Sequence, residues 1–128
     1  MNRAESGRFG EQYICGRLAG EGCEILARNY RARCGEIDII ASDGKYIRFV
    51  EVKLRADGSM VSGLEAVTPA KMRRIVRTAL LWLGEHPAPL QPRFDVAEVV
   101  VRAVGSDEVI HCNYIENAFD AEVCGEIF

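Results

Sequence analysis

Apolar residues recur at two spacings along the chain, and each spacing predicts a type of element. From Ser6 to Gly20 the apolar positions fall three and four residues apart, which is the period of a helix with one buried face. A second helical period follows Thr68 and Pro69, a good N-cap and first helical residue, and continues to about Gly84. The stripe of this second helix that we expect to face the core consists of Ile75, Ala79, Leu80 and Leu83.

Strand signals occupy much of the remaining sequence. Cys23–Tyr30 predicts a first strand, and Gly35–Lys53 predicts two strands joined by a turn. Residues 94–103 and 108–115 predict two more strands, because both are rich in Val or Ile. The order helix, three strands, helix, two strands indicates an α/β fold with a mixed β-sheet flanked by helices.

Composition narrows the class of protein. A chain of 128 residues with 48% hydrophobic residues can fill one core but hardly two. No apolar run approaches the roughly 20 residues of a membrane span, and the polar start lacks the apolar middle of a secretory signal. We therefore expect a cytoplasmic protein without a membrane partner. Five cysteines without a CxxC pair, and only two histidines, argue against a zinc site or a disulfide framework.

Charge is distributed unevenly along the chain. The net charge of -3 argues mildly against a nucleic-acid partner, yet no Lys or Arg follows Arg102, so the acidic excess lies at the C-terminal end. Two basic clusters precede it: Arg28, Arg31 and Arg33, and Lys71, Arg73, Arg74 and Arg77. Each cluster is either a surface that binds phosphates or, the more ordinary interpretation, a solvated face.

Two carboxylates interrupt the apolar strands of Gly35–Lys53. Burying a charged side chain is costly unless a partner compensates the charge. Asp38 and Glu51 therefore either face water or bind a partner that compensates their charges. A two-residue turn at 43–44 would pair Asp38 with Phe49 and make Glu51 the diagonal neighbour of Asp38, roughly 7 to 8 Å away. Lys53 then projects to the same side of the sheet.

These three side chains outline a metal site. Carboxylate oxygens suit Mg²⁺ or Mn²⁺, and a nearby ammonium can position a water or stabilise developing charge. The alternative is an exposed strand edge at which Glu51 and Lys53 form an ordinary ion pair. Glu11 favours the metal site, because it interrupts the apolar stripe of the first helix, although it also fits a glutamate on the helix surface.

The motifs resemble those of known families. Asp38 followed by Glu51-Val52-Lys53 resembles the PD-(D/E)XK nuclease signature, and with Glu11 in the first helix the layout resembles the archaeal Holliday junction resolvases. More closely, seven segments in order resemble the YraN family of uncharacterised bacterial proteins: GEQYICGRL, ILARNYR, GEIDIIA, FVEVKLR, AVTPAKMRRI, RFDV and NYIENAF. This match runs to about Phe119, so we take residues 1–119 as one domain and 120–128 as an acidic C-terminal extension.

The resemblance implies a restriction-endonuclease-like core with a metal site. Asp38, Glu51 and the carbonyl of Val52 would hold Mg²⁺ or Mn²⁺. Lys53 would be the catalytic lysine, and Glu11 would match the helix-borne acid of the resolvases. The implied activity is that of a metal-dependent nuclease or Holliday-junction-resolvase-like enzyme, which hydrolyses phosphodiester bonds of structured nucleic acid. The alternative is a protein of the same fold that binds nucleic acid, or acts as a scaffold, without turnover.

Other residues complete these expectations. The partner would be nucleic acid, either DNA, including branched DNA, or RNA. The candidates for contact with its phosphates are Arg31, Arg55, Lys71 and Arg74. A four-way junction has two-fold symmetry, so resolvase-like action implies a homodimer. Asp95 is either a group that supports the site or, more ordinarily, a polar residue at the start of a strand. Leu54 departs from the family pattern, which often has a small hydroxyl residue there.

Overall fold

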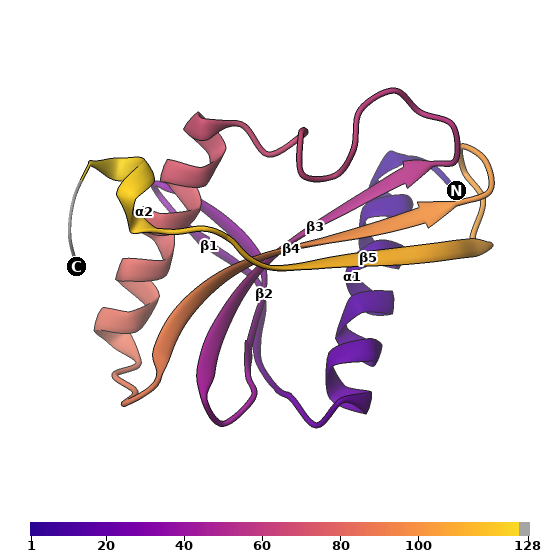
Figure 1. Ribbon diagram of the computed structural model, residues 1–128. Helices are drawn as coiled ribbons and strands as arrows, with labels where there is room; N and C mark the ends of the chain where they lie inside the picture. Colours follow the sequence, from indigo (N-terminus) through magenta and orange to yellow (C-terminus); the bar gives the residue numbers. More distant parts are fainter. Residues whose placement is uncertain (126–128) are drawn as a thin grey trace.

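The computed structural model describes residues 1–125, and their elements follow one another in the predicted order (Figure 1). The prediction of a mixed sheet flanked by helices is confirmed. The bounds are α1 Arg3–Gly20, β1 Glu24–Ala32, β2 Gly35–Ser42, β3 Tyr46–Ala56, α2 Pro69–Glu85, β4 Gln91–Val101 and β5 Val109–Phe119, followed by the short 3₁₀ helix η1 Ala121–Cys124.

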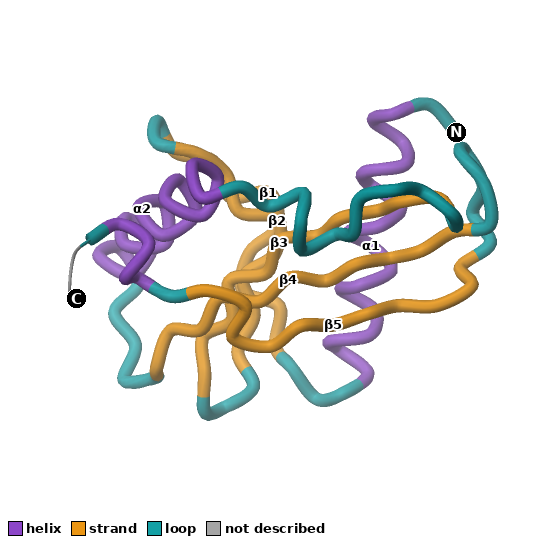
Figure 2. The backbone as a smooth tube through the Cα atoms, turned by 45° about the horizontal axis from the view of Figure 1, so that its top comes forward, coloured by secondary structure: helices purple, strands orange, loops and turns teal. Residues whose placement is uncertain are grey.

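The five strands form one sheet in the order β1-β2-β3-β4-β5. Within the described part of the chain, β3 and β4 run parallel and the other neighbouring strands are antiparallel. A parallel pair needs a crossover connection, which α2 and its flanking loops supply. Helices α1 and α2 lie on opposite faces of the sheet, so each face buries its own set of apolar side chains (Figure 2).

Aromatic side chains dominate the core beneath α2. Phe49 on β3 stacks on Phe94 of β4 with ring centroids 5.4 Å apart, and Trp82 of α2 meets Phe49 edge-on at 6.0 Å. The core beneath α1 is aliphatic, with Ile14 and Leu18 packed against the other side of the same strands. The two cores together hold the central strands, and with them the polar side chains that those strands carry.

The helices differ from the sequence prediction in detail. Helix α1 begins at Arg3 rather than near Ser6, because Asn2 and Glu5 form a capping box: the Asn2 side chain accepts the N–H of Glu5 at 2.9 Å. The start of α2 after Thr68 is confirmed. The prediction that Leu80 faces the core is wrong, because Leu80 is 37% exposed. The buried stripe of α2 is rotated, so that Val76 and Trp82 are buried instead.

The register between β2 and β3 also differs from the prediction. Phe49 pairs with Ile40, so the expected pairing of Phe49 with Asp38 is wrong by two residues. The Asp43 carboxylate accepts the backbone N–H groups two and three residues further on, at 2.8 and 2.7 Å, and thereby closes the turn that follows the last pair of the register, Ser42 with Ile47. A shift of two residues leaves every side chain on its predicted face.

The chain beyond Phe119 packs back onto the domain. Helix η1 contacts α2, and the Cys124 thiol lies 3.9 Å from the carbonyl oxygen of Arg73. The last three residues of the acidic extension, 126–128, lie outside the described residues. Within residues 1–125, neither helix combines the length and apolar character needed to cross a bilayer.

Candidate active site

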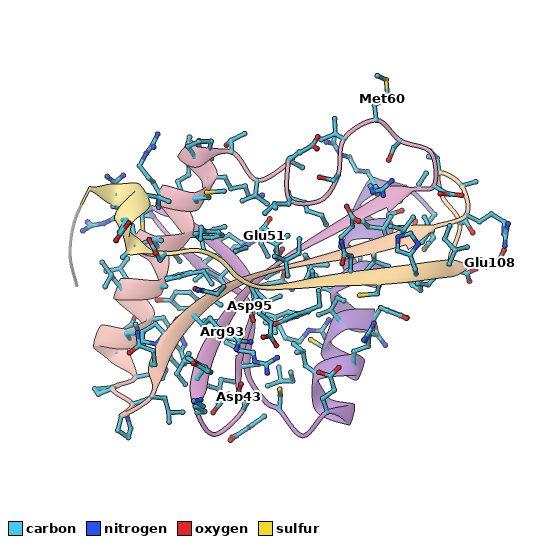
Figure 3. The ribbon with its side chains drawn as sticks, viewed as in Figure 1. Asp43, Glu51, Met60, Arg93, Asp95 and Glu108 are labelled. Carbon is cyan, nitrogen blue, oxygen red and sulfur yellow. The ribbon has the colours of Figure 1, made fainter. Side chains whose placement is uncertain are left out.

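A cavity of about 260 Å³ opens where β2, β3 and the first turns of α2 meet. Strands β2 and β3 pair as far as Ile39 and Val50, and the side chains of the next residue on each strand, Asp38 and Glu51, point into this space. Glu51 lies near the middle of the molecule rather than at its rim (Figure 3). The lining residues are Gly35, Glu36, Asp38, Glu51, Lys71, Arg74 and Ile75.

Asp38 is a buried carboxyl group with a shifted pKa. Its Oδ2 accepts the backbone N–H of Val52 at 2.8 Å, and the residue is 8% exposed. Extending the strand register by one place puts Asp38 directly opposite Glu51, rather than diagonal to it as the sequence predicted. Burial, and then the negative charge of Glu51, raise the pKa of Asp38 to about 7, although the Val52 N–H favours the ionised form.

Glu51 receives two lysine ammonium groups on one oxygen. The Nζ of Lys71 lies 2.8 Å from Glu51 Oε1, and the Nζ of Lys53 lies 3.3 Å from the same atom. Burial lowers the pKa of Lys71, but the hydrogen bond and charge of Glu51 outweigh burial and raise it. Burial and the adjacent Lys71 lower the pKa of Lys53. Two carboxyl groups and two ammonium groups therefore lie close together, with Asp38, Glu51 and Lys71 in the cavity lining and Lys53 beside it.

The pKa of Asp38 leads to a testable dependence of stability on pH. Since this pKa is about 7 in the folded protein and 3.8 without the fold, protonated Asp38 favours folding. This contribution is fully present below pH 3.8, declines as the pH rises from there, and is lost above about pH 7. Asp38→Asn keeps the neutral form at every pH. We expect it to raise the free energy of unfolding at pH 8 by up to about 4 kcal/mol, and by nothing near pH 3.

Urea denaturation of parent and variant at pH 3, 5, 7 and 8 checks this expectation. Asp57→Asn removes a carboxylate from an exposed loop and serves as the control, with little effect at any pH. If Asp38→Asn raises the free energy of unfolding by the same amount at every pH, the gain does not arise from the raised pKa of Asp38.

Glu11 does not join the two carboxylates in the cavity. It lies on α1, on the opposite face of the sheet, and its charge contributes to the raised pKa of Asp38 without lining the same space. Within residues 1–125, no three Asp, Glu, His or Cys side chains gather closely enough to hold a metal ion. Of the three carboxylates that the sequence singled out, the structure brings Asp38 and Glu51 together.

Helix α1 approaches β3 through Gly10. A Cβ atom at this position would lie 3.5 Å from side-chain atoms of both Val52 and Leu54, so these two side chains face α1. Side chains alternate along a strand, and Glu51 and Lys53 accordingly face α2. Leu54, the residue that departs from the family pattern, thus contacts the helix opposite the cavity and leaves the polar cluster unchanged.

The four predicted nucleic-acid contacts fall into two groups. Lys71 and Arg74 line the cavity. Arg31 lies on the neighbouring strand β1 and forms an exposed ion pair with Glu36 of β2, with the two charged groups 2.7 Å apart. Arg55 lies on β3 beyond Lys53, and its Nε binds Glu98 at 3.0 Å. Arg31 therefore lies beside the cavity, whereas Arg55 forms an ion pair with the buried Glu98.

Glu98 is a buried carboxylate that the sequence analysis missed. It lies on β4 in register with Lys53, is almost fully buried, and accepts the N–H of Gly63 as well as Arg55. A Cβ on Gly63 would lie 2.9 Å from Glu98 atoms, so only glycine permits this contact. Glu98 thereby holds the loop between β3 and α2 against the sheet. Its signal in the sequence was an acid inside the apolar run of β4.

Asp95 lies away from the cavity. It is fully buried. It lies inside β4, which begins at Gln91, so it is not a residue at the start of the strand. Its carboxylate accepts two hydrogen bonds from Arg93, both at 2.9 Å, as well as the Tyr114 hydroxyl at 2.5 Å and the Asn117 N–H at 2.9 Å. Arg93 and Asp95 lie side by side below Glu51 (Figure 3). Asp95 therefore joins β4 to β5 and does not support the carboxylate pair.

Comparison with known proteins identifies the family. The model of the uncharacterised protein family UPF0102 matches residues 10–99. The chain belongs to this family. The expected membership in the YraN family, which is UPF0102, is therefore confirmed. The UPF0102 match includes every residue that lines the cavity and ends within β4, before β5 and the acidic extension begin.

Individual relatives are similar over most of their length. A UPF0102 protein of Parafrankia sp. (strain EAN1pec) is 48% identical over 106 residues, which cover 82% of this chain and 90% of the relative. A UPF0102 protein of Symbiobacterium thermophilum is 47% identical over 118 residues, or 90% of this chain and 96% of the relative. The described domain thus corresponds to nearly the whole of these UPF0102 proteins.

Proposed function

We propose that this UPF0102 chain is a metal-dependent nuclease that hydrolyses phosphodiester bonds of structured nucleic acid. The observation that carries the proposal is the buried pair of carboxyl groups, Asp38 and Glu51, at the point where β2 and β3 stop pairing. The resemblance of Asp38 and Glu51-Val52-Lys53 to the PD-(D/E)XK signature supports the same conclusion. A cavity that opens beside both carboxyl groups gives a substrate access.

The donor set fits a hard divalent cation. Mg²⁺ keeps several waters and is commonly bound by one or two carboxylates, so Asp38 and Glu51 suffice, with the Val52 carbonyl as a third donor. Burial, and then the negative charge of Glu51, raise the pKa of Asp38, and a bound cation would offset both by favouring the ionised form. When bound, Mg²⁺ or Mn²⁺ would polarise the phosphodiester and lower the pKa of a coordinated water.

The side chains of the site would act on the substrate as follows. In hydrolysis the water oxygen bonds to phosphorus, the bond from phosphorus to the sugar oxygen breaks, and a proton passes to that leaving oxygen. The Lys53 ammonium, held beside Glu51, would stabilise the negative charge that develops on the phosphate oxygens. Lys71 and Arg74 at the cavity wall, with Arg31 beside it, would attract the phosphate backbone.

The proposal extends to the substrate and the assembly. The favoured substrate is DNA, and branched DNA in particular, by analogy with the resolvases whose layout the chain resembles. Cleavage of a four-way junction at two symmetric positions would require a homodimer.

A second candidate is a protein that binds nucleic acid without cleaving it. The observation that favours it is the state of Glu51, whose single negative charge already meets two ammonium groups. A site that is compensated in this way is stable without a cation. The presence of a buried Asp38 beside Glu51 favours the enzyme, since a binding surface for phosphates needs no converging carboxyl groups.

A cleavage screen separates the two candidates. Four-way junction, flap, duplex, single-stranded DNA and RNA are each incubated with Mg²⁺ or Mn²⁺, and nucleic-acid binding is measured on the same preparation. We expect the parent to cleave at least one substrate, and Glu51→Gln to lower the rate by at least about 100-fold.

Glu24→Gln, at the exposed start of β1, is the control and should cleave like the parent. A parent that binds these nucleic acids and cleaves none supports the second candidate. Equal cleavage by parent and Glu51→Gln would show that the active site lies elsewhere.

A further inference from the structure

Lys71 makes the shorter of the two ion pairs at Glu51. Its Nζ lies 2.8 Å from Glu51 Oε1, and Lys53 lies 3.3 Å from this oxygen. Glu51 is 4% exposed, so the two ammonium groups rather than water compensate its charge. With Glu36 and Arg74 of the cavity lining included, three carboxyl groups meet three cationic groups, which leaves no excess negative charge for an arriving cation.

We infer that the Lys71 ammonium occupies the place of the divalent cation on Glu51 and must leave before the cation can bind. This inference rests on the proposed function, because it concerns the same carboxylates. A carboxylate oxygen has two lone pairs, and Lys71 and Lys53 both donate to Glu51 Oε1, so one ammonium has to leave before this oxygen can coordinate a cation. Repulsion between two cations within a few ångströms, beside a carboxylate that is itself buried, disfavours their coexistence.

The position of Lys71 in the helix indicates why it is the group that moves. Lys71 is the third residue of α2, and the first turn of this helix has no acidic residue. A cation is unfavourable at a helix N-terminus, where the peptide dipoles present positive charge, so the contact with Glu51 compensates a cost. Without that contact, nothing in the first turn of α2 holds the ammonium.

Lys53 is less free to leave. It lies two residues from Glu51 on β3, which pairs with β4 over its full length, so its stem starts on the same face beside the carboxylate. The Lys71 side chain is 36% exposed and the Lys53 side chain 25% exposed. A flexible stem at the cavity mouth lets the Lys71 ammonium turn outward, beside Arg74. There it can bind a phosphate group, so cation and polyanion would favour each other's binding.

Titration of the protein with Mn²⁺ alone tests the inference. Isothermal calorimetry at one fixed pH compares the parent with Lys71→Met and Lys71→Gln, which keep most of the stem and remove the charge. We expect both variants to bind Mn²⁺ at least about tenfold more tightly than the parent, within the range of coupling found between sites. Lys45→Met removes the same charge from the exposed loop between β2 and β3 and should bind like the parent.

Each remaining outcome overturns the inference in a recognisable way. If the parent binds Mn²⁺ and the Lys71 variants bind it equally or more weakly, Lys71 does not compete with the cation, and the proposed function is unaffected. If Lys45→Met tightens binding as much as Lys71→Met, net charge alone accounts for the gain. If neither parent nor variants bind Mn²⁺ at millimolar concentration, the metal site of the proposed function fails together with the inference.

Discussion

Asp95→Ala is expected to lower the free energy of unfolding by about 3–5 kcal/mol, because the buried Arg93 guanidinium loses its hydrogen-bonded carboxylate and, within residues 1–125, keeps only the exposed Glu116, 3.7 Å away, as a counter-charge. The Arg93 side chain is only 10% exposed, and both of its hydrogen bonds to Asp95 would be lost. The Tyr114 hydroxyl and the Asn117 N–H would lose their acceptor as well. Asn117 has a positive φ of 51°, so the Asp95 contact also holds an irregular backbone position of β5.

Urea denaturation of parent and variant measures this loss in the free energy of unfolding, with one m-value fitted to both proteins. Asp107→Ala, in the exposed turn between β4 and β5, is the control and should change stability by less than about 0.5 kcal/mol. A loss of about 1 kcal/mol or less for Asp95→Ala would mean that water replaces the carboxylate, and that the network joins β4 and β5 only weakly.

The sequence predicts the order of elements because each element buries one face. Period and alternation report that burial directly, as with Ile14 and Leu18 on α1. The errors occur where local side-chain bonding decides the outcome. The capping box of Asn2 moves the start of α1, and the packing of Trp82 on Phe49 selects a buried stripe that excludes Leu80.

The carboxyl pair follows from the sequence, but its exact register does not. Alternation alone places Asp38 and Glu51 on one face, and a slip of two residues preserves that placement. The slip itself depends on Asp43, whose carboxylate accepts backbone N–H groups of the connection and binds the Arg48 side chain at 2.9 Å. Arg48 lies on β3, five residues after Asp43. The sequence of the turn itself, Asp43-Gly44, therefore does not reveal this contact.

The charge balance of the cavity depends on tertiary structure. Lys71 is twenty residues from Glu51 in the sequence, and the crossover of α2 brings the two side chains together. The sequence identifies Lys71 as a basic residue and a candidate phosphate contact. It contains no local pattern that predicts an ion pair with Glu51. Glu98 escaped prediction for the same reason, since its partners Arg55 and Gly63 lie on another strand and a loop.

Lys53→Met is expected to lower the rate of cleavage by about 100- to 1,000-fold while nucleic-acid binding changes little. The Lys53 ammonium lies beside Glu51, where in the proposed nuclease it can stabilise charge that develops in the transition state. It is half-buried and lies apart from the proposed phosphate contacts. Removal of a positive charge next to the carboxylates should leave Mn²⁺ affinity equal or slightly higher. Single-turnover cleavage and Mn²⁺ calorimetry on one preparation measure both quantities.

The combination of rate and affinity assigns the role of Lys53. Lys45→Met controls for the change in net charge and should cleave like the parent. A loss of cleavage that follows a loss of Mn²⁺ affinity would make Lys53 a residue that organises the metal site rather than a catalytic residue. Equal rates for parent and Lys53→Met would remove Lys53 from the chemical step. In that case Lys71, the other ammonium on Glu51, would be the next residue to test.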